Sequence, residues 1–182
     1  GDHRDLHSSL HDALPIYQTS EIRNLALLGN SGSGKTTLAE AMVFQSGALT
    51  RKGEISAKNT ISDYKPIEKE NENSVFSSVV FAEHKNKKIN FIDNPGMGDF
   101  IGSVINSLYP ADSAAMIINA QNGVEVGTEI HKRQLDKFQK PMIIGLNHLD
   151  HEKTNYERSI EMVKETRSES TRLNSSHVAI SY

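Results

Sequence analysis

A run of eight residues in the first quarter of the chain has the composition of an anion-binding loop. It reads Gly-Asn-Ser-Gly-Ser-Gly-Lys-Thr from Gly29 to Thr36 and matches the pattern G-x-x-x-x-G-K-[S/T] in full. Small residues let consecutive backbone N–H groups turn inward around a phosphate, Lys35 adds a positive charge, and the Thr36 hydroxyl suits Mg²⁺. The loop predicts a nucleoside triphosphate site of the kind that kinases, ATPases and GTPases share; the alternative is a Gly- and Ser-rich turn that contains a lysine.

A second motif reads Asp-Asn-Pro-Gly from Asp93 to Gly96 and follows an apolar run. An acid at the carboxyl end of a strand beside the phosphate loop can hold Mg²⁺, and the following Gly96 lets its backbone N–H approach a γ phosphate. The pattern D-x-x-G is short and also occurs in ordinary loops. Its position directly after a strand favours the functional interpretation.

A third motif reads Asn-His-Leu-Asp from Asn147 to Asp150 and follows another apolar run. The Asp150 carboxylate can accept hydrogen bonds from N1–H and the 2-amino group of guanine, whereas adenine has an acceptor at N1 and no 2-amine. Asn147 would hold the surrounding loops and reach the other edge of the base, and the His148 ring could stack on it. The alternative is a polar turn between a strand and a helix.

Alternating apolar runs and helical periods supply the elements that position these motifs. A buried run ends at Gly29, and the segment after the phosphate loop has helical spacing. We predict an α/β fold of three layers with a mostly parallel sheet. The expected strands are 22–28, 74–81, 88–92, 114–120 and 142–147, the helices are 35–45 and 126–138, residues 84–87 form a hairpin turn, and 47–73 is a long loop that is either functional or disordered.

Composition excludes several other classes of protein. The 182 residues carry a formal net charge of −3, which argues against nucleic-acid binding by bulk charge, and the absence of cysteine excludes disulfides, thiol nucleophiles and Cys-ligated zinc. The eight histidines show no paired metal-ligand spacing, and no apolar run is long enough to span a bilayer. We expect the head, 1–21, and the tail, 166–182, to be non-native or disordered, since parts of both resemble translated sequencing adapters.

The three motifs, in this order and spacing, resemble a translational GTPase, most closely the GTP-binding domain of elongation factor G and its diverged paralogues. The resemblance covers residues 22–165 and implies a P-loop NTPase fold that is truncated before its last strand and helix. It implies a GTPase that binds GTP or GDP with Mg²⁺ and switches conformation with nucleotide state. The implied protein is a cytoplasmic monomer that contacts large-subunit RNA of the ribosome and neither membrane nor DNA.

The resemblance also assigns roles to residues. Glu68, Glu70 and Ser74 match the first switch segment of the family, and Ser74 falls on the threonine that caps Mg²⁺. Catalytic positions are Lys35, Thr36, Gly96 and Met97, and the Mg²⁺ ligands are Thr36, Ser74 and Asp93. Nucleotide contacts fall on Asn30, Ser31, Gly32, Ser33, Gly34, Lys35, Thr36, Thr37, Asp93, Gly96, Asn147, His148 and Asp150.

Four departures from the family pattern bear on function. Gly32 replaces an aspartate, Asn71 and Glu72 replace an Arg-Gly pair, and His148 replaces the lysine of the guanine site. Met97 stands where the family has the histidine that orients the attacking water, and a thioether cannot align a water in this way. We therefore expect tight nucleotide binding with slow hydrolysis.

Three functions remain open from the sequence alone. The first is the nucleotide switch of a ribosomal translocation factor, and the second is a GTP-dependent ribosome-binding module with weak or no hydrolysis, which Met97 favours. The third is an ATP-using P-loop enzyme, against which Asp150 argues.

Overall fold

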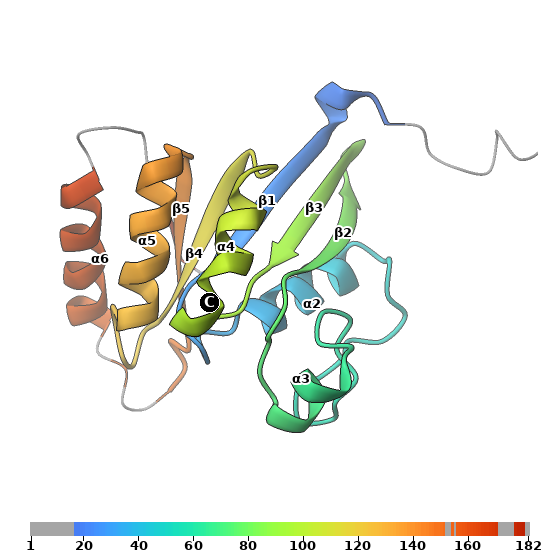
Figure 1. Cartoon of the computed structure of the whole chain (residues 1–182), viewed down its shortest axis with the longest axis horizontal. Helices are drawn as coiled ribbons and strands as arrows, with labels where there is room; N and C mark the ends of the chain where they lie inside the picture. Colours follow the sequence, from blue (N-terminus) through green and yellow to red (C-terminus); the bar gives the residue numbers. More distant parts are fainter. Residues whose placement is uncertain (1–16, 152–153, 155, 171–176, 181–182) are drawn as a thin grey trace, which may run out of the picture.

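The computed structural model describes residues 17–151, 154, 156–170 and 177–180. Its strands form one sheet in the order β2-β3-β1-β4-β5-β6, in which β2 and β3 are antiparallel and every other neighbouring pair is parallel. The strands lie side by side in Figure 1 and span β1 (Ile22–Leu28), β2 (Ser78–His84), β3 (Lys87–Asp93), β4 (Ser113–Asn119), β5 (Met142–Asn147) and β6 (His177–Ile180).

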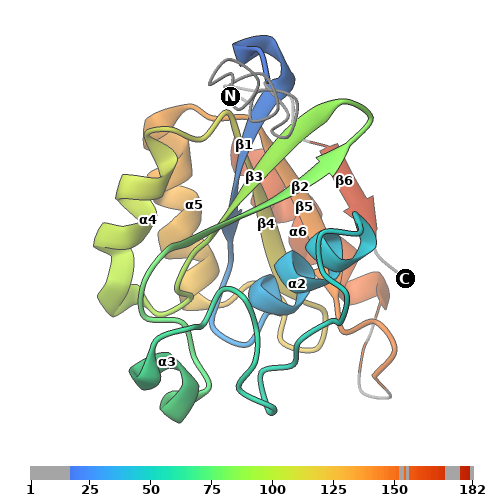
Figure 2. The same cartoon turned by 90° about the vertical axis from the view of Figure 1, so that its right-hand side faces the viewer.

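Helices cover both faces of the sheet, with α4 and α5 on one face and α2 on the other (Figure 2). None of the helices in the described ranges is long and apolar enough to cross a membrane. The helices are α2 (Lys35–Gln45), α3 (Pro66–Asn71), α4 (Ile101–Leu108), α5 (Val126–Phe138) and α6 (Tyr156–Ser170), with single 3₁₀ turns at η1 (Thr19–Glu21) and η2 (Gly98–Phe100).

Two apolar clusters fill the space between these layers. Side chains on a strand alternate between its faces, so Leu27 packs with Ala39 and Val43 of α2, while Leu28 packs in the cluster that contains Val104 of α4 and Leu135 of α5. A central strand buried on both faces explains the continuous apolar run of β1. The predicted three-layer α/β fold with a mostly parallel sheet is confirmed.

The sequence located several elements to the residue: β1, α2, α5 and β5 have the predicted bounds. The hairpin turn is also confirmed, since Lys85 and Asn86 both have positive φ between β2 and β3, as a two-residue hairpin loop requires. The strand predicted at 74–81 was wrong at its start. The Val75 and Phe76 N–H groups donate to the Glu68 carboxylate, so sheet pairing begins only at Ser78.

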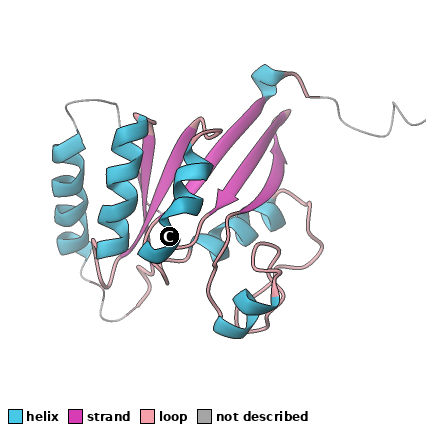
Figure 3. Cartoon of the chain, in the orientation of Figure 1, coloured by secondary structure: helices cyan, strands magenta, loops and turns pink. Residues whose placement is uncertain are grey.

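Other elements were not predicted. The long loop 47–73 contains α3, where Pro66 occupies the first helical turn, and α4 and α6 were missed altogether (Figure 3). Two elements reach into the expected tail: β6 pairs parallel to β5 there, and α6 extends to Ser170. Within the expected head, η1 lies at Thr19–Glu21, whereas residues 1–16 and 171–176 lie outside the described residues.

The strand directions gather the three motifs at one edge of the sheet. β1, β3, β4 and β5 run parallel, and the carboxyl ends of β1, β3 and β5 lead into the phosphate loop, the Asp93 motif and the Asn147 motif. In open α/β sheets this edge is where ligands bind.

Candidate nucleotide-binding site

The phosphate loop joins β1 to α2 in a shape that only glycine adopts easily. Gly29, Gly32 and Gly34 all have positive φ, and Gly34 is the residue that caps the N-terminus of α2. A Cβ at Gly29 would overlap the Ile117 carbonyl, so the sequence needs glycine there for packing as well as for backbone angle. The loop thus presents backbone N–H groups and a helix N-terminus to an anion.

Lys35 is buried at the start of α2, and its Nζ donates to the Asn30 carbonyl at 2.8 Å. Burial lowers its pKa to about 8, against the opposing effect of Asp93 and Asp63. The ammonium therefore stays mostly protonated at neutral pH in a place where little water solvates it. A phosphate oxygen beside it would supply the missing negative charge.

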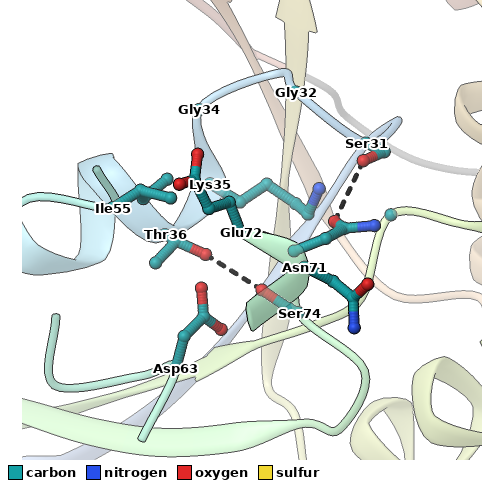
Figure 4. A pocket seen from close by; sticks show the side chains of 12 residues that line it. Ser31, Gly32, Gly34, Lys35, Thr36, Ile55, Asp63, Asn71, Glu72 and Ser74 are labelled. Carbon is teal, nitrogen blue, oxygen red and sulfur yellow. Dashed lines mark hydrogen bonds between the residues drawn. The ribbon is translucent and has the colours of Figure 1, made fainter. Parts of the chain in front are cut away.

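A cavity of about 290 Å³ opens beside this loop (Figure 4). The phosphate loop forms one wall, the segment from Asn71 to Ser74 together with Ile55 and Asp63 forms another, and Gly96 closes a third side. The cavity therefore joins the phosphate loop, the predicted first switch segment and the Asp93 motif.

Oxygen-bearing side chains meet beside the phosphate loop, and three of them, on Thr36, Asp63 and Ser74, line the cavity. The Thr36 hydroxyl donates to Asp93 Oδ2 at 2.7 Å and lies 3.2 Å from the Ser74 hydroxyl. Figure 4 shows the Asp63 carboxylate turned toward Thr36 and Ser74. The structure thus brings the three predicted Mg²⁺ ligands together and adds Asp63, which sequence reasoning missed.

These carboxylates have unusual acidities. Burial raises the pKa of Asp93 to about 6, although the Thr36 hydroxyl and Lys35 act in the opposite direction. Burial also raises the pKa of Asp63, which the Ser74 hydroxyl opposes. Asp93 Oδ1 is buried and has no hydrogen-bond partner among the described residues. Two desolvated carboxylates and two hydroxyls are the hard oxygen ligands that Mg²⁺ prefers, so the residues fit this ion.

Gly96 lies against the phosphate loop. A Cβ at this position would overlap the backbone nitrogen of Ser31, so only glycine allows the two segments to approach this closely. The neighbouring Asn94 fixes the segment, because its buried amide donates to the carbonyls of Leu27 and Ile92. Met97 follows with 41% of its surface exposed.

The Asn147 motif meets the phosphate loop from the other side. Asn147 Nδ2 donates to the Ser33 carbonyl at 3.0 Å, and a Cβ at Gly34 would overlap that nitrogen. The His148 ring lies beside Gly34, and its buried Nε2 has no hydrogen-bond partner within the described part of the chain. Asp150 is exposed at the end of the motif. Asn147 and His148 are therefore placed at the loop, while Asp150 remains open to solvent.

Not every predicted contact residue lines the cavity. Ser31, Gly32, Gly34, Lys35, Thr36 and Gly96 do so, but the cavity wall does not include Asn30, Ser33, Thr37, Asp93, Asn147, His148 or Asp150. Thr37 is exposed on the first turn of α2, and Ser33 is fully buried. The nucleotide contacts predicted for all of these residues stay predictions.

His131 of α5 is a further residue at the site. It is fully buried, and its Nδ1 accepts a hydrogen bond from the Gly29 N–H at 3.0 Å. Burial lowers the pKa of His131 to about 4, assisted by the charge of Lys35, so the imidazole is neutral at neutral pH. The sequence predicted a core or surface histidine here, and only its position in the fold reveals the contact with the phosphate loop.

Known proteins share both the sequence and the fold. Residues 20–181 match the model of the family described as the elongation factor Tu GTP binding domain. The chain is 36% identical over 144 residues to the elongation factor G-like protein of Thermotoga maritima, which covers 79% of this chain and 20% of that protein. It is 33% identical over 156 residues to the mitochondrial ribosome-releasing factor 2 of Candida dubliniensis, a match that covers 86% of this chain and 19% of that protein. The chain spans about a fifth of the length of these curated relatives.

Solved structures agree. A protein of Thermus thermophilus, ttk003000868, superimposes with a TM-score of 0.78 at 33% identity, over 81% of this chain and 22% of that one. The translation elongation factor SelB of Methanococcus maripaludis, solved with the GTP analogue GppNHp, gives a TM-score of 0.65 at 20% identity, over 87% of this chain and 29% of that one. The second likeness shows the fold alone.

Proposed function

This chain belongs to the family of the elongation factor Tu GTP-binding domain, and from that premise we propose that it is the nucleotide switch of an elongation factor G-like translocation factor. It binds GTP and GDP with Mg²⁺, and the segments before β2 and after β3 change conformation with the nucleotide. The observation that carries the proposal is the meeting of Thr36, Ser74 and Asp93 beside the phosphate loop. The partner of the full-length, monomeric, cytoplasmic protein is the ribosome through its large-subunit RNA.

The chain's own groups account for phosphate binding. Backbone N–H groups of residues 31–36 and the buried Lys35 ammonium surround the phosphates. The negative phosphates stabilise this ammonium, which burial deprives of water. Thr36, Ser74 and Asp93 would hold Mg²⁺, and the ion would neutralise charge on the phosphate oxygens. An anionic Asp93 is the form that binds the cation, so its pKa of about 6 predicts weaker Mg²⁺ binding as the pH falls below 6.

Base selection rests on the Asn147 motif. Asn147 fixes the base-side loop to Ser33, and Asp150 accepts two hydrogen bonds from guanine. The test is competition for a labelled GTP: unlabelled GTP and GDP should displace it, and a roughly 100-fold excess of ATP should not. Replacement of Asp150 by Asn should weaken GTP binding by roughly 10- to 100-fold, because it removes a charged acceptor, while Asp136→Asn on α5 should not. Equal displacement by ATP would favour the ATP-using enzyme.

A second candidate function is a GTP-dependent ribosome-binding module with weak or no hydrolysis. Met97 favours it, since its Sδ accepts a hydrogen bond from Asn73 and has no proton with which to orient a water. Loss of a water-positioning group slows phosphoryl transfer by orders of magnitude while binding persists. Single-turnover GTP cleavage with and without ribosomes distinguishes the two functions. Met97→His should raise the rate and Met97→Leu should not; ribosome-stimulated cleavage at a high rate by the unchanged protein would exclude the module.

A further inference from the structure

Three segments that are far apart in the sequence are bridged by one amide at the mouth of the phosphate cavity. Ser31 Oγ of the phosphate loop donates to Asn73 Oδ1 at 3.0 Å, and Asn73 Nδ2 donates to Met97 Sδ at 3.0 Å. An amide can accept at one end and donate at the other, which neither a carboxylate nor an aliphatic side chain can do. Both ends of the Asn73 side chain are used.

We propose that Asn73 is a positioning residue that latches the segment before β2 over the bound triphosphate by bridging Ser31 and Met97. The inference rests on the proposed function, because it assigns the latch to the same nucleotide site. It adds a role for Met97 that does not depend on hydrolysis: the thioether accepts the hydrogen bond that closes the latch.

The backbone on both sides of Asn73 is held in place. Glu72 ends α3 with a φ of 50°, and the Asn73 N–H donates to the Glu68 carbonyl at 3.2 Å. The buried Glu68 carboxylate accepts hydrogen bonds from the Val75 and Phe76 N–H groups at 3.1 and 3.0 Å. The turn therefore fixes the direction in which the Asn73 side chain leaves the backbone.

The latch acts on the residue next to it. Ser74, directly after Asn73, has its hydroxyl 3.2 Å from the Thr36 hydroxyl. Movement of Asn73 away from Ser31 and Met97 would carry Ser74 away from Thr36. Met97 is 41% exposed, so loss of the bridge should affect loop position far more than folding stability.

Dissociation of a fluorescent, non-hydrolysable GTP analogue from the full chain, followed by stopped flow in the presence of Mg²⁺, tests the latch. Loss of an ordinary hydrogen bond should raise the dissociation rate about 5-fold, and loss of one to sulfur about 3-fold. Asn73→Leu removes both bonds and should release the analogue roughly 15-fold faster, whereas Met97→Leu removes only the bond to sulfur and should release it about 3-fold faster. Met97→Gln keeps an acceptor and should release it at the original rate. Asn106→Leu, the same change on the exposed surface of α4, is the matched control and should have no effect.

A double variant tests whether Asn73 and Met97 act through their direct hydrogen bond. In the Asn73→Leu background, Met97→Leu should cause no further acceleration, because its hydrogen-bond donor is already gone. Equal release rates in all variants, with tight binding by the unchanged protein, would overturn the latch and leave the proposed function standing. Failure of the unchanged protein to bind any guanine nucleotide would overturn both. If Asn73→Leu lowers the melting temperature strongly, the comparison of Met97→Leu with Met97→Gln tests the latch without it.

Discussion

The buried histidine beneath the phosphate loop should make folding stability depend on pH. His131 is fully buried, and burial lowers its pKa to about 4 from an ordinary value of 6.5. The folded state therefore binds a proton at His131 less readily than the unfolded state does. The contribution of the neutral imidazole to the free energy of unfolding is fully present above pH 6.5 and is lost as the pH falls toward 4. At about 1.36 kcal/mol per pH unit the whole effect is about 3 kcal/mol, of which about 2 kcal/mol is lost by pH 5.

Comparison with His131→Gln isolates this effect. Glutamine can still accept from the Gly29 N–H and does not titrate, so urea unfolding should show the variant gaining about 2 kcal/mol relative to the unchanged protein between pH 7.5 and 5. The comparison with the variant is needed because Asp93 affects stability in the opposite direction. Its pKa is raised to about 6, so the stability that the folded state gains from a protonated Asp93 is lost as the pH rises through 6. His84→Gln, at an exposed histidine of β2, leaves the buried imidazole in place and should retain the pH dependence.

The result that would refute this reasoning is a constant difference. If the free energies of unfolding of the unchanged protein and His131→Gln differ by the same amount at pH 7.5 and 5, within about 0.5 kcal/mol, the imidazole is not held neutral by burial. The hydrogen bond from Gly29 to Nδ1 would then not describe the site in solution.

Two further substitutions test how the loops are held. Glu68→Ala removes a buried acceptor that serves three backbone N–H groups, so unfolding should become easier by about 3 kcal/mol and amide exchange should rise at 73–77, while Glu70→Ala at an exposed position should change neither. Gly96→Ala places a methyl group on the backbone nitrogen of Ser31, so titration calorimetry should show at least about tenfold weaker GTP binding by a folded protein. Gly102→Ala, which has open space around it in α4, should bind normally.

The parts of the fold that could be predicted are those where local signals agree. Strand β1 is a continuous apolar run that stops at Gly29, and α2 lies between Gly34 and Gly47, so residue type sets both boundaries. By contrast, α4 does carry helical spacing, since Ile101, Val104 and Leu108 lie at i, i+3 and i+7 and pack in the core, but the helix spans only eight residues, a short window for recognising that period. The strand β6 depends on pairing with β5, which its own four residues do not indicate.

The phosphate loop could be predicted because its chemistry lies in eight consecutive residues, but its supports could not. Asp63 reaches the cavity only because the long loop folds back under α2, where Glu40 accepts the Gly53 and Ile61 N–H groups. A charged residue in a polar loop has no periodicity and no fixed spacing from the motif. His131 likewise looks like any core histidine until the fold places it under Gly29.

Three residues outside the phosphate loop hold its shape. His131 accepts from the Gly29 N–H, Asn147 donates to the Ser33 carbonyl, and Asn73 accepts from the Ser31 hydroxyl, so three other segments contact the loop. A loop fixed in this way loses less conformational entropy when it binds a phosphate. Gly32 takes part in none of these three contacts, and a Cβ built there would meet open space, so a side chain at this position could change the charge of the wall without disturbing them. The chemistry at the mouth of the site and the shape of its phosphate cradle can therefore vary independently.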